Sequence, residues 1–124
     1  MLQSATLRGS PVEEPHSLFR ALGDPTRIRI VNLLAAGELC VCDVVELLSL
    51  PQPTISRHLA LLRSTGLVRT RRLGRFMHYR LANPGTELHA TLLGALQRDL
   101  DSQTLSAERS EAEARVAERQ RAPC

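Results

Sequence analysis

The chain has 124 residues, a length that predicts one domain with a single apolar core. Hydrophobic residues make up 43% and charged residues 23% of it, as in a soluble globular protein, and no apolar run approaches the roughly 20 residues that span a membrane. The N-terminus lacks the apolar segment of a signal peptide, so we expect a cytoplasmic protein without membrane contact.

The net charge is only +3, but the basic side chains are unevenly distributed. Seven arginines and no acidic residue lie between Glu46 and Glu87, and the chain contains no lysine. A block of one sign in a nearly neutral chain indicates contact with a polyanion. The segment therefore favours nucleic acid as the partner.

Short helices are expected in the first half of the chain. The first covers residues 15–22, and Asp24 followed by Pro25 predicts the start of a second, which ends at Gly37. A third covers 41–48 and a fourth runs from residue 52 or 53 to 64. Two short helices joined by a tight turn, the second basic and polar at its start, form a helix-turn-helix.

After residue 66 the apolar period changes from helical to alternating. Residues 67–73 and 76–81 are predicted to form two strands around a Gly74-Arg75 turn, the wing of a winged helix. The odd positions 77–81 would face the core, and the even positions 76–80 would face solvent.

A longer helix is expected after Thr86. Its leucine stripe has little else in the sequence to cover it and predicts dimerisation through Leu88, Leu92 and Leu96. We therefore expect a mainly α fold with a small β-hairpin wing, a homodimeric winged helix-turn-helix domain over residues 15–101. Residues 1–14 would form a flexible arm and residues 102–124 a polar tail, either a frayed helical extension or disordered.

The polar side of the helix-turn-helix predicts how DNA is bound. The recognition helix would present Gln52, Thr54, Ser56, Arg57 and His58 to the major groove, while wing residues Arg71, Arg72 and Arg75 would grip the backbone or minor groove. A two-fold dimer requires a double-stranded operator with an inverted repeat. A protein-binding winged helix is the alternative, but it leaves the cationic face unexplained.

A pair of cysteines, Cys40 and Cys42, lies at the start of the third helix. In a regular helix such neighbours point about 200° apart, so two thiolates could hold one soft ion only by unwinding the first turn. That distortion would move the recognition helix. The alternative is that both cysteines simply pack in the core. An enzyme is not expected, because no histidine lies near the cysteines in the sequence and no phosphate loop or paired-carboxylate motif occurs.

At this point the sequence closely resembles the ArsR/SmtB family of metal-responsive repressors. The matching stretches are residues 19–27, 38–43, 54–63 and 74–81, which include the Glu-Leu-Cys-Val-Cys-Asp string. The resemblance implies a homodimer that represses its operon until metal binding releases DNA, with no permanent cofactor. It also implies that Cys40 and Cys42 form a thiolate box like that of the arsenic- and cadmium/lead-responsive branches.

Departures from the family pattern bear on the effector. The arsenic branch often has a third cysteine where this chain has Val45, so Cys124 is the remaining candidate for a third ligand. Cadmium/lead members add cysteines in the N-terminal arm, and residues 1–39 contain none. Trivalent arsenic or antimony is therefore the expected effector, and a two-thiol site could also suit a singly substituted organic arsenical.

Alternatives on the same scaffold remain open. The zinc-sensing branch uses ligands on the last helix, for which Glu87, His89, Asp99 and Asp101 are candidates without a second histidine. A thiol redox sensor, with Cys40 or Cys42 oxidised and perhaps paired to Cys124, and a regulator without effector are the others.

Overall fold

A computed structural model describes residues 14–99 and 103–122. The elements in chain order are α2 (Pro15–Leu22), α3 (Pro25–Leu34), β1 (Leu39–Cys40), α4 (Val41–Leu48), α5 (Gln52–Ser64), β2 (Val68–Leu73), β3 (Phe76–Leu81), α6 (Glu87–Asp99) and α7 (Gln103–Arg121). The predicted winged helix-turn-helix fold is confirmed. Within the described ranges no helix is both long enough and apolar enough to cross a membrane.

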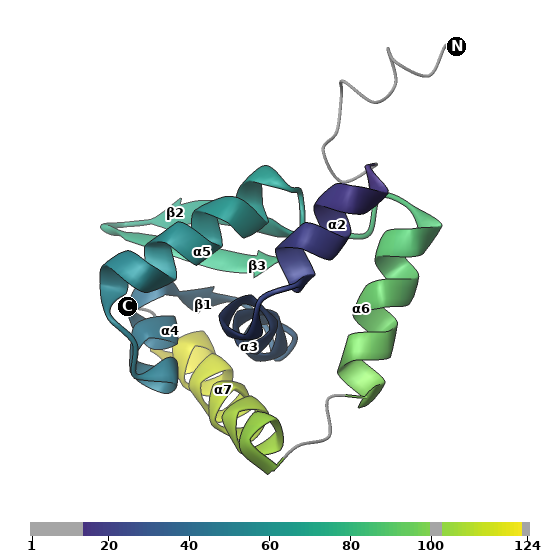
Figure 1. Cartoon of the computed structure of the whole chain (residues 1–124). Helices are drawn as coiled ribbons and strands as arrows, with labels where there is room; N and C mark the ends of the chain where they lie inside the picture. The colour runs from purple at the N-terminus through teal and green to yellow at the C-terminus, as the bar shows by residue number, and fades with distance from the viewer. Residues whose placement is uncertain (1–13, 100–102, 123–124) are drawn as a thin grey trace.

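Helix α3 occupies the centre of the molecule, with α2, α4, α5 and α7 packed around it (Figure 1). Ile30 and Leu33 of α3 are fully buried, as are Leu18 of α2 and Val44 of α4 within about 1%. Because the chain has few aromatic residues, these aliphatic side chains make up the core.

The corner between α2 and α3 is built by polar side chains. The Asp24 carboxylate accepts a 3.0 Å hydrogen bond from the Arg27 backbone N–H, which caps α3 as the Asp-Pro pair predicts. The Arg27 guanidinium donates to the carbonyls of Ala21 at 2.7 Å and Arg20 at 3.0 Å, which lie at the end of α2. Arg27 therefore joins the two helices.

The helix-turn-helix consists of α4, a short turn and α5. Ser49 ends α4 in the left-handed conformation, with φ 55°, and Pro51 precedes α5 in extended conformation. Ile55, Leu59 and Leu62 are fully buried, so one face of α5 is anchored to the core and the other is left for contacts.

The hairpin forms a three-stranded antiparallel sheet in the order β1-β3-β2, and β1 was not anticipated. Gly74 supplies the positive φ, 62°, that the two-residue turn requires. His78, expected to face solvent, is only 4% exposed. The expectation is wrong because β1 pairs with β3 and places Glu38 within 3.7 Å of the His78 ring.

The expectation of a frayed or disordered C-terminal extension is wrong for residues 103–121. They form α7, which packs against α3, α4 and β1 (Figure 1). Ala112 and Glu108 are buried, and Arg109 donates to the Asn32 carbonyl at 2.8 Å. Polar contacts with the core hold this helix where apolar residues are scarce.

Candidate DNA-binding face and cysteine site

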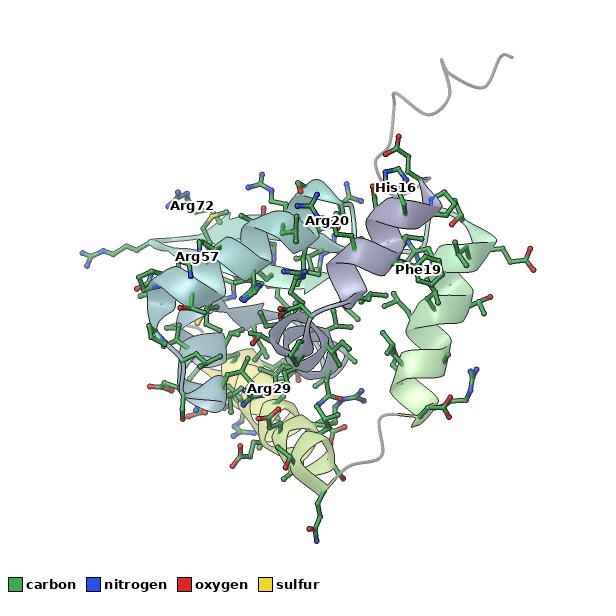
Figure 2. All side chains as sticks on the ribbon, viewed as in Figure 1. His16, Phe19, Arg20, Arg29, Arg57 and Arg72 are labelled. Carbon is green, nitrogen blue, oxygen red and sulfur yellow. The ribbon has the colours of Figure 1, made fainter. Side chains whose placement is uncertain are left out.

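Predicted DNA-binding residues gather where α5 meets the wing. Gln52 and Arg57 are exposed on α5, and Thr54 and Ser56 are half-buried. Figure 2 shows Arg57 on α5 and Arg72 on the hairpin at the same end of the molecule. The polar face of the recognition helix and the basic wing thus share one surface, as the sequence predicts.

Two of the predicted contacts point elsewhere. The His58 Nδ1 lies 3.2 Å from the Arg27 guanidinium and 3.9 Å from the Asp24 carboxylate, so this ring faces the α2–α3 corner. The Arg71 guanidinium forms an ion pair with Glu38 at 2.8 Å, on the sheet face that carries His78. These interactions favour the wing residues Arg72 and Arg75 over Arg71 as DNA contacts.

A hollow of about 450 Å³ separates the recognition helix from the wing. Its lining includes Cys42 of α4 together with Gln52, Ser56, Arg72 and Arg75. The half-buried thiol therefore borders the same surface as the side chains predicted to contact DNA.

Cys40 lies on the opposite side of this turn and is fully buried. It is the N-cap of α4, with extended backbone (φ −83°, ψ 163°), and the last residue of β1. Its thiol donates to the Asp43 carboxylate at 3.1 Å, and its backbone N–H donates to the same oxygen at 3.2 Å. Asp43 thereby fixes the backbone and the side chain of Cys40.

Sequence reasoning placed both cysteines inside a helical turn that would have to unwind, and that geometry is wrong. The sulfurs of Cys40 and Cys42 and a carboxylate oxygen of Asp43 lie within 4.8 Å of one another. Two bonds of about 2.3 Å to one ion can span about 4.6 Å. Since Cys40 precedes the helix, the two sulfurs can reach one ion with small side-chain movements and an intact α4.

Asp43 connects the cysteine turn to the C-terminal helix. Burial opposes its ionisation, but hydrogen bonds from Arg119 and Arg115 outweigh burial and lower the pKa of Asp43 from 3.8 to about 2, with a smaller contribution from Cys40. Arg115 and Arg119 each lie 2.7 Å from the carboxylate. Sequence reasoning missed both arginines. The signal lay in the helical spacing of Glu108, Ala112, Arg115 and Arg119.

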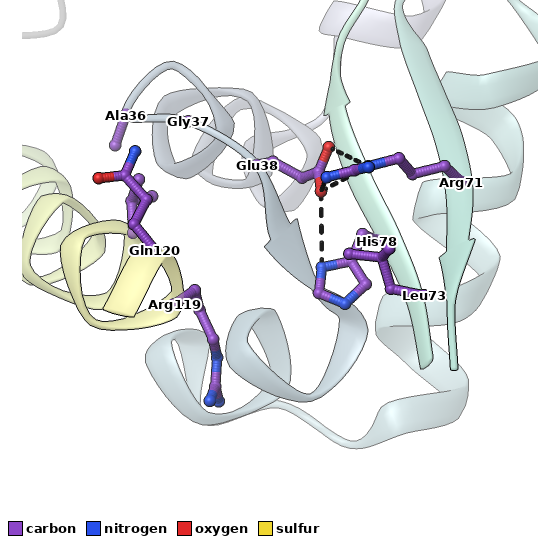
Figure 3. Close-up of a pocket in the computed structure, with 9 residues that line it drawn as sticks. Ala36, Gly37, Glu38, Arg71, Leu73, His78, Arg119 and Gln120 are labelled. Carbon is purple, nitrogen blue, oxygen red and sulfur yellow. Dashed lines mark hydrogen bonds and ion pairs between the residues drawn. The ribbon is translucent and has the colours of Figure 1, made fainter. Parts of the chain in front are cut away.

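A pocket of about 350 Å³ lies between this sheet and α7. Figure 3 shows Glu38 bonded to Arg71 and close to His78, with Arg119 extending from α7. The pocket residues belong to the polar layer that joins α7 to the sheet.

The remaining candidate ligands are not gathered. Cys124 and Asp101 lie outside the described residues. Glu87 and Asp99 are exposed, whereas His89 is fully buried, accepts from the Gly85 backbone N–H at 3.2 Å, and has a pKa lowered by burial. In residues 14–99 and 103–122, the one cluster of three or more metal-ligating groups is Cys40, Cys42 and Asp43.

The expected dimerisation residues lie on α6 and are partly buried. Leu88 and Leu92 pack against the core, Leu96 is half-buried, and Leu93 is buried. Phe19 of α2 is 56% exposed and lies between α2 and α6 in the view of Figure 2. An aromatic side chain this exposed adds apolar surface beside the predicted interface.

A helix-turn-helix with a buried inner face, followed by an arginine-rich β-hairpin on the same surface, defines a winged helix-turn-helix DNA-binding protein. The family described as "Bacterial regulatory protein, arsR family" matches residues 24–70. The chain belongs to this ArsR family.

Individual relatives agree with this assignment. The arsenical resistance operon repressor of Escherichia coli is 55% identical over 69 residues, 55% of this chain and 59% of the relative. The uncharacterized HTH-type transcriptional regulator MJ1325 of Methanocaldococcus jannaschii is 46% identical over 68 residues, 54% of this chain and 76% of the relative. The chain therefore spans about three fifths of the Escherichia coli relative's length.

Among solved structures, the transcriptional repressor BigR from Xylella fastidiosa is similar with a TM-score of 0.61 and 30% identity. The match covers 83% of this chain and all of that one. These relatives are named as transcriptional regulators, not enzymes.

Proposed function

We propose that this protein is a homodimeric transcriptional repressor that releases its operator when trivalent arsenic or antimony bonds to Cys40 and Cys42. The observation that carries the proposal is the position of Cys42. Its thiol lines the hollow between recognition helix and wing, and its sulfur lies within 4.8 Å of that of Cys40. An effector held by both thiols borders the surface that reads DNA.

The chemistry of the pair suits a soft, thiol-seeking effector. As each As–S bond forms, a thiol proton and a hydroxyl group of arsenous acid leave together as water, so the step needs no oxidant or reductant. The name of the Escherichia coli relative, an arsenical resistance operon repressor, supports the same effector. Cys124 stays the proposed third ligand, since the position of the usual third cysteine is Val45.

The DNA contacts follow from the shared surface. The start of α5 would enter the major groove, where glutamine suits adenine edges and arginine suits guanine. The exposed side chains Gln52 and Arg57 are placed for this role. Arg72 and Arg75, beside the same hollow, would contact the DNA backbone or minor groove.

Arg57 and Arg75 are expected to have different roles. Arg57→Ala should weaken binding to the specific site by about 1–3 kcal/mol and relax specificity at one base pair, because a base contact is lost. Arg75→Ala should weaken binding to all sequences alike and reduce the salt slope by about 1, because a phosphate contact is lost. Fluorescence anisotropy on specific and random duplexes at several salt concentrations measures both effects.

Arg98→Ala is the matched control for these two variants, because Arg98 is exposed on α6, outside the DNA-binding face. It removes the same charge and should leave DNA affinity close to that of the wild type. Equal losses on every sequence for Arg57→Ala and Arg75→Ala would refute the division between base reading and backbone contact.

A homodimer is proposed from α6 and its surroundings. The half-buried leucines Leu88, Leu92 and Leu96 and the exposed Phe19 offer an apolar surface suited to a second copy. Two recognition helices related by a two-fold axis would then read an inverted repeat. A monomeric mass in sedimentation equilibrium at micromolar concentration would refute this arrangement.

The effector is tested by operator release. An operator selected from random duplex DNA is bound by the wild-type protein and then titrated separately with arsenite, antimonite, cadmium, lead, zinc and peroxide. Arsenite and antimonite are expected to release the DNA. Release by a divalent ion alone would identify a different metal sensor, and release by peroxide alone, reversed by a thiol reductant, would identify a redox sensor.

A further inference from the structure

Helix α7 is attached to the domain mainly by charged and polar contacts. Arg29 pairs with Glu108, and the Asn32 side chain donates to the Leu105 carbonyl at 2.8 Å. Of its apolar side chains, Ala112 is buried and Val116 packs against the core. Because so little apolar surface holds α7, its docking depends strongly on the polar contacts at each end.

The C-terminal end of α7 is fixed through one carboxylate. Arg115 and Arg119 both contact Asp43 at 2.7 Å, and Arg119 donates a second hydrogen bond to it at 3.1 Å. The same carboxylate accepts from the Cys40 thiol. A candidate effector ligand and two α7 arginines thus share a single, fully buried acceptor.

Docking of α7 is also close at the turn before β1. Gly37, with φ 147°, lies so near Val116 that a Cβ atom there would be 2.8 Å from a methyl carbon. Arg119 and Val116 both line the pocket between α7 and the sheet (Figure 3). Helix α7 therefore lies against the segment that leads into Cys40, whose side chain is fully buried in this arrangement.

We propose that Arg115 and Arg119 are positioning residues of the cysteine site, and that α7 is a clamp which effector binding loosens. The proposal rests on the effector function proposed above. A sulfur bonded to arsenic has given up its proton with a hydroxyl group as water, so it no longer donates to Asp43. The effector also needs space beside the carboxylate that the two arginines hold.

Effector binding and α7 docking then oppose each other, and linkage makes the relation reciprocal. If the effector weakens the Asp43 contacts, loss of those contacts must strengthen effector binding. Removing the arginine charges is therefore expected to expose Cys40 and to lower the arsenite concentration that releases DNA. A purely structural role for α7 would not increase sensitivity to the effector.

The first measurement is the labelling rate of Cys40 in a full-length Cys42→Ser/Cys124→Ser background, with an aromatic disulfide reagent. Adding Arg115→Gln and Arg119→Gln is expected to speed labelling about tenfold or more, since labelling follows local opening. Arg115→Lys with Arg119→Lys should restore much of the protection. Arg121→Gln, which removes a charge from an exposed position on the same helix, should label like the background protein.

The second measurement uses proteins with all three cysteines. The arsenite midpoint for operator release is expected to fall several-fold in the Arg115→Gln/Arg119→Gln variant but not in Arg121→Gln. An unchanged labelling rate in a variant with wild-type circular dichroism would overturn the clamp, as would an unchanged or raised arsenite midpoint. Failure of arsenite to release DNA from the wild type would instead reject the proposed effector, while the labelling comparison would still test α7.

Discussion

The Cys40→Ser variant is expected to bind operator DNA like the wild type and to lose release by arsenite. Serine is close in size to cysteine and can still donate to Asp43, so the N-cap of α4 is retained. A hydroxyl is a poor ligand for a soft ion, so the bridge to Cys42 is lost. An allosteric coupling of about 2–3 kcal/mol, equal to about 30- to 150-fold in operator affinity, should disappear.

Anisotropy titrations with and without arsenite measure this coupling. Cys42→Ser is expected to act in the same way, because one thiol alone cannot bridge the ion. Cys124→Ser tests the third ligand, since an unchanged response would show that Cys124 is not required. Normal arsenite release from both Cys40→Ser and Cys42→Ser would reject the proposed site.

The Asp43→Asn variant is expected to be destabilised by about 2–4 kcal/mol at pH 7. The substitution keeps the size of the side chain but removes the charge that offsets Arg115 and Arg119 at a fully buried position. It also replaces an acceptor of the Cys40 backbone and thiol. Urea unfolding at pH 7 gives the difference in free energy of unfolding.

The destabilisation should depend on pH. The pKa of Asp43 is about 2 in the folded protein, below its ordinary value of 3.8, so the carboxylate stabilises the fold fully above pH about 4 and loses this effect as the pH falls toward 2. The shift corresponds to about 2 kcal/mol. Wild type and Asp43→Asn should therefore converge in stability between pH 4 and pH 2.

Glu46→Gln is the matched control for Asp43→Asn. Glu46 also pairs with Arg115 at 2.8 Å, but its side chain is 68% exposed, so its loss should change stability little. If Glu46→Gln proved as destabilising as Asp43→Asn, or if the Asp43→Asn difference were independent of pH, burial of the Asp43 charge would not be the cause.

Much of the fold follows from short-range patterns in the sequence. The Asp24-Pro25 pair starts α3, the break at residues 49–51 separates α4 from α5, and Gly74 marks the hairpin turn. These features depend on neighbouring residues, because capping, proline geometry and positive φ act within a few positions. The exposed side of α5 likewise followed from the helical spacing of its apolar residues.

What the sequence determined by itself is the class of the protein: the helix-turn-helix, the basic wing and the paired cysteines are all contiguous signals. Only the tertiary structure decided that Cys40 caps α4 from the end of a strand, that His78 is buried behind Glu38, and that α7 docks on Asp43. The reason is physical. A strand two residues long and a helix held by ion pairs gain their stability from partners distant in the chain, and no local propensity encodes those pairings.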